Sequence, residues 1–264
     1  MTINSYLGNP LLKSLNTPQN YTKEEIQEYV KCRDDPIYFI STYMTIVNVD
    51  EGLMKFELWP FQEDLINVLS NNRFCVVKCP RQSGKSQTSL AFMLHYVLFN
   101  DQRNIAILAN KGATARELLG RLQFAYEKLP MFIQQGVSEW NKGSIFLENG
   151  SRILASSTSS ASIRGYSFNL IFLDEFAFVP QNLAEEFFNS VYPTISSGQT
   201  SQVIIVSTPN GMNHFYKMWT NAIEGRSDYS AFSVNWWDVP GRDEEWKRQT
   251  IANTSEEQFR QEFE

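Results

Sequence analysis

Short apolar segments alternate with longer helical segments from Trp59 onward in this 264-residue chain, and this alternation constrains the fold more than any other feature. Apolar runs of about 4–8 residues bounded by turn residues are typical of strands buried in a parallel sheet, in which helices form the crossover connections. The predicted strands are 74–79, 104–109, 169–173, 202–207 and 231–236. The predicted helices are 60–71, 85–100, 114–128 and 183–191. The sequence therefore predicts an α/β fold with a mostly parallel sheet flanked by helices.

A β-hairpin is predicted where residues 144–156 interrupt this alternation. Apolar runs flank the dipeptide Asn149-Gly150, which favours a hairpin turn because both residues tolerate positive φ.

The two ends of the chain are predicted to be helical in part. Thr22 followed by Glu25 matches the capping box and predicts a helix that ends near residues 34–36. The apolar segment 37–49 is compatible with either a helix or a strand, and a charged helix is expected after the last strand.

A phosphate-binding loop is predicted between the strand at 74–79 and the helix that follows. Its sequence is Cys79-Pro80-Arg81-Gln82-Ser83-Gly84-Lys85-Ser86. Gly84, Lys85 and Ser86 match the G-K-[ST] end of the phosphate loop, whereas Cys79 replaces its first glycine. In such a loop, backbone N–H groups at the helix N-terminus bind phosphate, the lysine reaches the β- and γ-phosphates, and the serine hydroxyl binds Mg²⁺. The sequence therefore predicts binding of ATP with Mg²⁺.

Two acidic residues follow the apolar run 170–173 and match the Walker B pattern. Asp174 is expected to hold Mg²⁺, and Glu175 is expected to activate the attacking water as a general base. Ligands bind at the carboxyl ends of parallel strands, where both residues lie in this prediction. A base for water favours hydrolysis over kinase chemistry.

The chain resembles the N-terminal ATPase half of tailed-phage terminase large subunits, in particular the T-even type. The motifs that carry this resemblance are Arg81 in a loop without the first glycine, the segment Val206–Gly211, Trp140–Ser144 and Asn213–Tyr216, and the resemblance spans about Trp59–Phe263. It implies a RecA-like P-loop fold of the ASCE class with a small lid subdomain. It also implies a motor that hydrolyses ATP to move double-stranded DNA into the procapsid.

The resemblance assigns roles to further residues. Phe61 and Gln62 match the adenine-recognition motif, and the phosphate loop from Pro80 to Ser86 would bind ATP, with Arg81 sensing the γ-phosphate or stabilising transition-state charge. Ser207 and Thr208 match the coupling motif that reports loss of the γ-phosphate. Ring motors also need an arginine from the neighbouring subunit, and the candidates are Arg121, Arg152 and Arg164, of which we favour Arg121.

The resemblance also implies an organisation and a set of partners. Residues 1–58 would begin the lid subdomain, 59–222 would form the ATPase core, and 223–264 would pack with the lid. The expected partners are double-stranded DNA, the portal protein, the small terminase subunit and further copies in a ring of about five subunits, docked on the procapsid in the host cytoplasm. Family members carry a C-terminal nuclease. Because the chain ends at Glu264, about where that domain would begin, we expect no nuclease activity from it.

Composition limits other functions. The net charge of −6 does not favour tight binding to nucleic acid through many phosphate contacts. The sequence has no signal peptide pattern and no apolar run of the roughly 20 residues needed to span a bilayer, so neither secretion nor a membrane location is expected. Its three cysteines lack the spacing of a zinc site and are expected to be buried apolar groups.

Two alternatives remain open from the residues alone. A superfamily 2 helicase would share Gln62, Lys85, Asp174 and Glu175, although it needs a second RecA-like domain. A non-catalytic assembly module with a vestigial nucleotide site is the other alternative.

Overall fold

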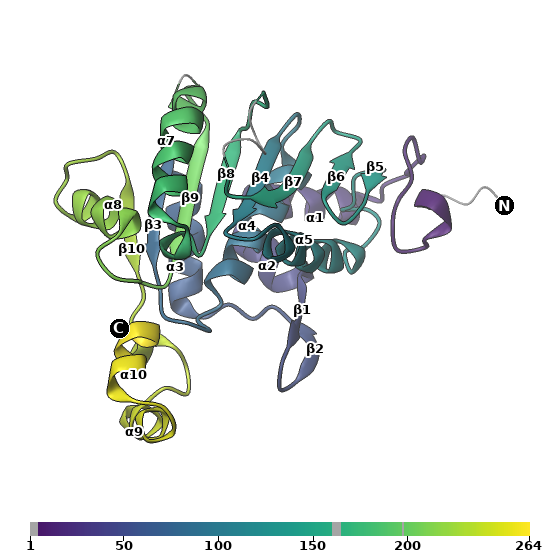
Figure 1. Ribbon diagram of the computed structural model, residues 1–264. Coiled ribbons are helices and arrows are strands. Elements are labelled where there is room, and N and C mark those ends of the chain that lie inside the picture. Colours follow the sequence, from purple (N-terminus) through teal and green to yellow (C-terminus); the bar gives the residue numbers. More distant parts are fainter. Residues whose placement is uncertain (1–4, 160–164, 197) are drawn as a thin grey trace.

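A central sheet dominates the computed structural model, which describes residues 5–159, 165–196 and 198–264 (Figure 1). The strands of this sheet are β3 (Phe74–Lys78), β4 (Asn104–Ala109), β5 (Val137–Trp140), β6 (Ser144–Leu147), β7 (Arg152–Ser157), β8 (Leu170–Asp174), β9 (Gln202–Ser207) and β10 (Ser230–Ser233). Within the described residues the strand order is β10-β3-β9-β8-β4-β7-β6-β5. Neighbouring strands from β10 to β7 pair in parallel, and β7, β6 and β5 pair antiparallel. The mostly parallel α/β sheet predicted from the sequence is thus confirmed.

Helices cover both faces of the sheet, because its central strands are apolar on both sides. The helices that belong to this body are α3 (Pro60–Asn71), α4 (Lys85–Phe99), α5 (Gly112–Glu127), α7 (Gln181–Ser196) and α8 (His214–Ile223). Alternate residues of β3 point to opposite faces. Cys75 and Val77 pack in the cluster formed with α3, α4 and α5, whereas Phe74 and Val76 pack with α7 and α8. The site-bearing loops are therefore supported from both sides.

The predicted hairpin is present as β6 and β7. Gly150 has φ +78°, and its N–H donates to the carbonyl of Leu147, while the N–H of Leu147 donates to the carbonyl of Ser151. Only the glycine of the Asn-Gly pair adopts positive φ, which is the geometry of a three-residue hairpin loop with a glycine in the left-handed region. Strand β5, which was not predicted from the sequence, pairs with β6 at the sheet edge.

The N-terminal segment packs on the core. It contains the 3₁₀ turn η1 (Tyr6–Gly8), the helices α1 (Lys23–Asp34) and α2 (Pro36–Tyr43), and the antiparallel strands β1 (Thr45–Asn48) and β2 (Gly52–Lys55). The capping box at Thr22 and Glu25 is formed as predicted, with each residue's side chain bonded to the other's backbone N–H. The segment 37–49, whose type the sequence left open, divides between α2 and β1. Phe39 and Ile40 are fully buried in the same cluster as α3, α4 and α5.

The C-terminal segment is divided between the sheet and a separate pair of helices. It contains β10, η3 (Trp236–Asp238), α9 (Glu244–Asn253) and α10 (Glu256–Phe263), and η2 (Phe176–Phe178) lies earlier, after β8. Figure 1 shows α9 and α10 below the sheet, next to the loop that follows β3. The division of the chain at residues 58 and 222 stays a prediction. However, β10 belongs to the main sheet, so a part of the predicted C-terminal segment lies in the core body.

Two expectations from composition concern the cysteines and membrane segments. Cys32, Cys75 and Cys79 are buried free thiols, as expected for small apolar groups. Across the described parts of the chain, no helix is both long enough and apolar enough to span a membrane.

Candidate active site

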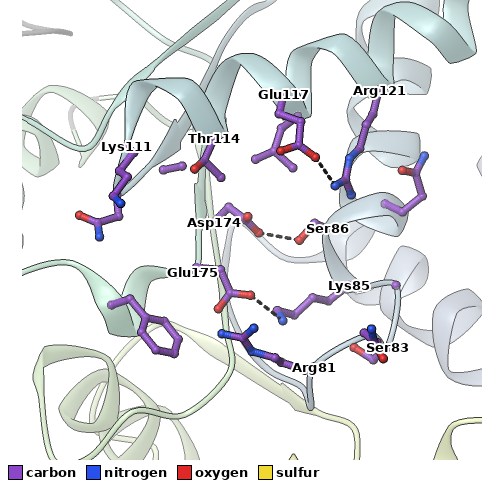
Figure 2. Close-up of a pocket in the computed structure, with 17 residues that line it drawn as sticks. Arg81, Ser83, Lys85, Ser86, Lys111, Thr114, Glu117, Arg121, Asp174 and Glu175 are labelled. Atoms are coloured by element: carbon purple, nitrogen blue, oxygen red, sulfur yellow. Dashed lines mark hydrogen bonds and ion pairs between the residues drawn. The ribbon is translucent and has the colours of Figure 1, made fainter. Parts of the chain in front are cut away.

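A cavity of about 560 Å³ opens at the carboxyl ends of β3, β4 and β8 (Figure 2). The residues that line it are Arg81, Gln82, Ser83, Gly84, Lys85, Ser86, Gln87, Ala109, Asn110, Lys111, Thr114, Glu117, Leu118, Arg121, Asp174, Glu175 and Phe178. The phosphate loop and the acidic pair predicted from separate parts of the sequence therefore line one cavity. This is the edge of a parallel sheet at which ligands bind.

The phosphate loop has the backbone geometry that its sequence predicts. Gly84 lies in the left-handed region with φ +76° at the N-terminus of α4. A Cβ atom at this position would lie 2.5 Å from Nε2 of Gln62, so glycine is required by both its φ and its surroundings. Ser83 is fully buried, and its hydroxyl donates to the carbonyl of Pro80 at 2.9 Å. The N–H groups in the first turn of α4 have no intrahelical acceptor, which makes this helix end suitable for binding phosphate.

Lys85 connects three of the predicted motifs. Its side chain is 6% exposed, and Nζ lies 2.8 Å from Oε1 of Glu175. Nζ also donates to the hydroxyl of Thr208 at 3.1 Å. The loop, the acidic strand and the coupling segment are thus brought into contact by one ammonium group.

Asp174 and Ser86 form a pair of oxygen ligands suited to a divalent cation. The Ser86 hydroxyl donates to Oδ1 of Asp174 at 2.7 Å, and Asp174 is 4% exposed. The pKa of Asp174 is raised to about 6, mainly because the group is buried; the hydrogen bond from Ser86 opposes the rise, and the charge of Glu175 adds to it. A buried carboxylate that is costly to ionise gains a favourable partner in a cation, and oxygen ligands are those that Mg²⁺ prefers. These residues therefore fit Mg²⁺.

Glu175 occupies an unusual backbone conformation directly after β8. Its φ and ψ are 48° and 45°, in the left-handed region that residues with a side chain rarely adopt. Oε2 accepts a hydrogen bond from the backbone N–H of Thr208 at 3.3 Å, while Oε1 faces Lys85. The side chain is 33% exposed, so water can reach it. Strained backbone of this kind concentrates at functional sites, where it directs a side chain.

Ser207 and Thr208 lie at the end of β9, directly beside the acidic residues. Both are fully buried. The Ser207 hydroxyl accepts a hydrogen bond from the N–H of Ala177 at 3.0 Å and donates to the carbonyl of Thr208 at 2.8 Å. The predicted coupling segment is therefore in contact with both Glu175 and the turn that follows it.

Arg81 lies in the cavity wall and is held by the C-terminal helices. Its backbone N–H donates to the carbonyl of Glu262 at 2.9 Å, and its side chain forms an ion pair with the Glu262 carboxylate. Figure 2 shows the guanidinium on the same side of the cavity as Glu175 and Lys85. The adjacent Gln82 has φ +55°, a left-handed conformation that is unfavourable for a residue with a side chain.

The structure does not place Phe61 and Gln62 in the cavity. Gln62 is buried behind the loop, where Nε2 donates to the carbonyl of Ser83 at 3.2 Å and Oε1 accepts from the N–H of Trp59 at 3.0 Å. Phe61 packs against Trp59, with ring centroids 5.6 Å apart. Both polar atoms of the Gln62 amide are thus hydrogen-bonded within the protein, and these bonds support the phosphate loop. The adenine contact stays a prediction.

The arginine candidates for a neighbour's site lie in three different settings. Arg121 lines the cavity of its own chain and forms an ion pair with Glu117 (Figure 2). Arg152 begins β7, at the opposite end of the strands from the cavity, and its guanidinium lies 4.8 Å from the ring centre of Phe146. Arg164 lies outside the described residues. The role of an arginine supplied to a neighbour stays a prediction, and Arg121 also has a place at its own site.

Several residues of the site were missed by the sequence analysis. Lys111, Thr114 and Glu117 line the cavity from the start of α5. Since they directly follow the predicted strand 104–109, the rule that ligands bind at strand carboxyl ends could have found them. Arg242 and Glu262, which contact the loop from the C-terminal segment, carry no local signal in the sequence.

The fold and the cavity define the chain as a member of the P-loop nucleoside triphosphatases, with a mostly parallel sheet and an acidic pair opposite the phosphate loop. Residues 77–264 match the family model described as terminase large subunit, T4likevirus-type, N-terminal. The chain belongs to this family.

Known terminases share both sequence and fold with the chain. The large terminase subunit of Thermus phage G20c is 28% identical over 116 residues, which cover 39% of this chain and 23% of that protein. The large terminase ATPase domain of Thermus phage P74-26 superposes with a TM-score of 0.66 at 22% identity, covering 79% of this chain and 93% of that one. The HK97 bacteriophage large terminase superposes with a TM-score of 0.72 at 17% identity, covering 88% and 54%. A large terminase of a thermophilic bacteriophage in complex with ADP superposes with a TM-score of 0.53 at 13% identity, covering 74% and 50%. The match therefore spans less than a quarter of the curated relative and about half of two of these solved chains.

Proposed function

We propose that this chain hydrolyses ATP and acts as the motor of viral DNA packaging, moving double-stranded DNA into the procapsid. Membership of the terminase family supports the biological role. The observation that carries the chemistry is the convergence of Lys85, Ser86, Asp174 and Glu175 on one cavity, with Lys85 2.8 Å from Glu175 and Ser86 2.7 Å from Asp174.

The contacts of Lys85 and Glu175 suggest how binding and hydrolysis are linked. The β- and γ-phosphates carry more negative charge than one carboxylate, so bound ATP competes with Glu175 for the Lys85 ammonium. Release of Glu175 from this ion pair leaves a carboxylate that can accept the proton of a water molecule. That water attacks the γ-phosphorus as the bond to the β-phosphate oxygen breaks, giving ADP and phosphate.

Ser86 and Asp174 would hold Mg²⁺. When bound, Mg²⁺ neutralises charge on the β- and γ-phosphates. Arg81 would add a planar, permanent positive charge near the γ-phosphate.

Ser207 and Thr208 give the site a route to the rest of the molecule. Both contact the segment that carries Glu175, and Thr208 also contacts Lys85. We infer that loss of the γ-phosphate changes the partners of these groups and shifts the end of β9. A nucleotide can move the protein only as far as it binds the two arrangements with different affinity.

The partners follow from the family and belong to this proposal. They are double-stranded DNA, the portal protein, the small terminase subunit and further copies in a ring of about five, which would complete each site with an arginine. The setting would be the host cytoplasm, with the ring docked on the procapsid portal. The net charge of −6 is compatible with DNA contacts that are made and released rather than held.

The proposal is tested by measuring ATP hydrolysis of the purified chain with and without double-stranded DNA, beside Lys85→Ala and Glu175→Ala. Turnover that depends on both residues supports it. Strand displacement on a forked duplex would indicate the helicase alternative, and failure to bind Mg·ATP at all would contradict the motor. Mg·ATP binding without turnover in the isolated chain would indicate that a neighbouring subunit completes the site.

A further inference from the structure

Two residues of the C-terminal segment contact the phosphate loop from outside the cavity. Nη2 of Arg242 donates to the backbone carbonyls of Arg81 and Gln82, at 2.9 and 3.2 Å. On the other side of the same loop segment, the N–H of Arg81 donates to the carbonyl of Glu262 at 2.9 Å, and the two side chains form an ion pair. The backbone and the side chain of Arg81 are therefore both held by residues far along the chain.

Arg242 and Glu262, which make these contacts, are themselves held in place by their neighbours. The Arg242 guanidinium packs against two aromatic rings, 4.8 Å from the ring centre of Trp246 and 5.3 Å from that of Phe263. These rings meet edge to face with centroids 5.1 Å apart. The side chain of Asp243 caps α9 by accepting from the N–H of Trp246 at 2.8 Å, which fixes the helix start next to Arg242. Arg242, which directly precedes the cap of α9, and Glu262 on α10 are thus held together by the packing of these two helices.

The loop segment that receives these bonds contains an unfavourable backbone conformation. Gln82 has φ +55°, a conformation that a side chain makes unfavourable and that persists only where surrounding contacts hold it. Arg81 is exposed and lines the cavity on the side of Glu175 (Figure 2). A displacement of this segment moves the guanidinium relative to the γ-phosphate position.

We propose that Arg242 and Glu262 are positioning residues for ATP hydrolysis, which act through Arg81 by fixing the backbone and orienting the guanidinium of this loop residue. The inference rests on the proposed ATPase function. The coupling also acts in the reverse direction, because coupling between two sites is symmetric. If Arg81 changes its contacts when the γ-phosphate is bound or lost, the placement of α9 and α10 changes with it.

The kinetic test uses two conservative variants with controls on α9 and α10. Glu262→Gln keeps the size of the side chain and removes its charge. Arg242→Lys keeps the charge but removes the planar guanidinium that packs against Trp246 and Phe263. Their controls are Glu256→Gln on α10 and Arg248→Lys on α9, whose partners Arg260 and Glu245 belong to exposed ion pairs within the helices. We expect the two test variants to lower kcat by about tenfold to a hundredfold, as misplacement of a reacting group by about 1 Å does, with little change in KM. The controls should keep the parent rate.

Dependence on Arg81 separates positioning from a general loss of structure. The rate of single-turnover hydrolysis should be measured in an Arg81→Ala background. In this background Glu262→Gln should have no further effect on the rate. An equal effect with and without Arg81, or test variants that match their controls, would overturn the proposal.

Amide hydrogen exchange tests the contacts between Arg242 and the loop backbone independently of turnover. Arg242→Lys should speed exchange in residues 81–84 several-fold relative to Arg248→Lys, while exchange in the central strand β9 stays unchanged. Unchanged exchange in residues 81–84 would overturn the proposal even if the chain hydrolyses ATP. Faster exchange in Arg242→Lys, together with no turnover by the parent, would support these contacts and show that the isolated chain does not catalyse hydrolysis by itself.

Discussion

Replacement of Gly84 by alanine should destabilise the chain through two separable effects. The backbone of Gly84 has φ +76°, and an added Cβ would lie 2.5 Å from Nε2 of Gln62. Gln62 cannot move away freely, since its amide joins the carbonyl of Ser83 to the N–H of Trp59 inside the protein. The new methyl group must therefore break at least one of these buried hydrogen bonds.

The magnitude follows from adding the two effects. The left-handed conformation costs a residue with a Cβ about 1–2 kcal/mol. A buried donor or acceptor left without its partner costs about 1–3 kcal/mol. Gly84→Ala should therefore lower the free energy of unfolding by about 2–5 kcal/mol. Gly225 is a matched control with φ +67° and no atom within 4 Å of its added Cβ, so Gly225→Ala should lower it by only about 1–2 kcal/mol.

Urea unfolding followed by circular dichroism measures both values. A double-mutant cycle with Gln62→Ala isolates the collision, because Gly84→Ala should cost only the backbone strain once the Gln62 side chain is absent. Equal destabilisation by Gly84→Ala and Gly225→Ala, or full additivity in the cycle, would refute the role of Gln62 as the support of the loop.

Three further predictions concern single groups. Asp174→Asn should abolish hydrolysis yet raise the free energy of unfolding at pH 7 by up to about 3 kcal/mol. The reason is that the pKa of Asp174 is raised from 3.8 to about 6, so the folded chain loses stability as pH rises through this range. No gain at pH 7 in urea unfolding would contradict this. Burial lowers the pKa of His95 below 6.5, so His95 binds a proton at higher pH in the unfolded chain than in the folded one. The free energy of unfolding should therefore fall as pH drops below about 6.5. His95→Gln should reduce this dependence in unfolding curves at pH 5 and 7. Thr208→Val removes the hydroxyl that accepts from Lys85 and should slow ATP turnover by about two- to tenfold, the worth of one hydrogen bond; an unchanged rate would indicate that this contact is not used in the reaction.

The sheet and the residues that line the cavity from its strand ends could be predicted because their signals are local. The strand at 104–109 and the helix at 60–71 agree with the structure residue for residue, since apolar periodicity and the Pro60 helix start define both. Lys85 and Glu175 lie at a strand-to-helix junction and at a strand end, two places where topology alone brings residues of a parallel sheet together.

The parts that were missed depend on long-range contacts or weak local signals. Helix α8 begins with an Asn213 side chain that accepts from the N–H of Tyr216, a capping signal present in the sequence but followed by aromatic residues of modest helix propensity. The position of Gln62 behind the loop depends on contacts with Ser83, and that of Arg242 on rings in two later helices. No local pattern encodes either arrangement.

Comparison of ATP binding with ATP cleavage in Glu175→Gln tests the central claim most directly. The claim is that Lys85 binds the nucleotide and Glu175 activates water in one shared cavity. Equilibrium binding of Mg·ATP and single-turnover hydrolysis should be measured for the parent, Glu175→Gln and Lys85→Ala. We expect Glu175→Gln to bind Mg·ATP at least as tightly as the parent, because Lys85 has lost a competing carboxylate, and to cleave it at least about a hundredfold more slowly. Lys85→Ala should lose binding as well. Cleavage by Glu175→Gln at the parent rate would contradict the account.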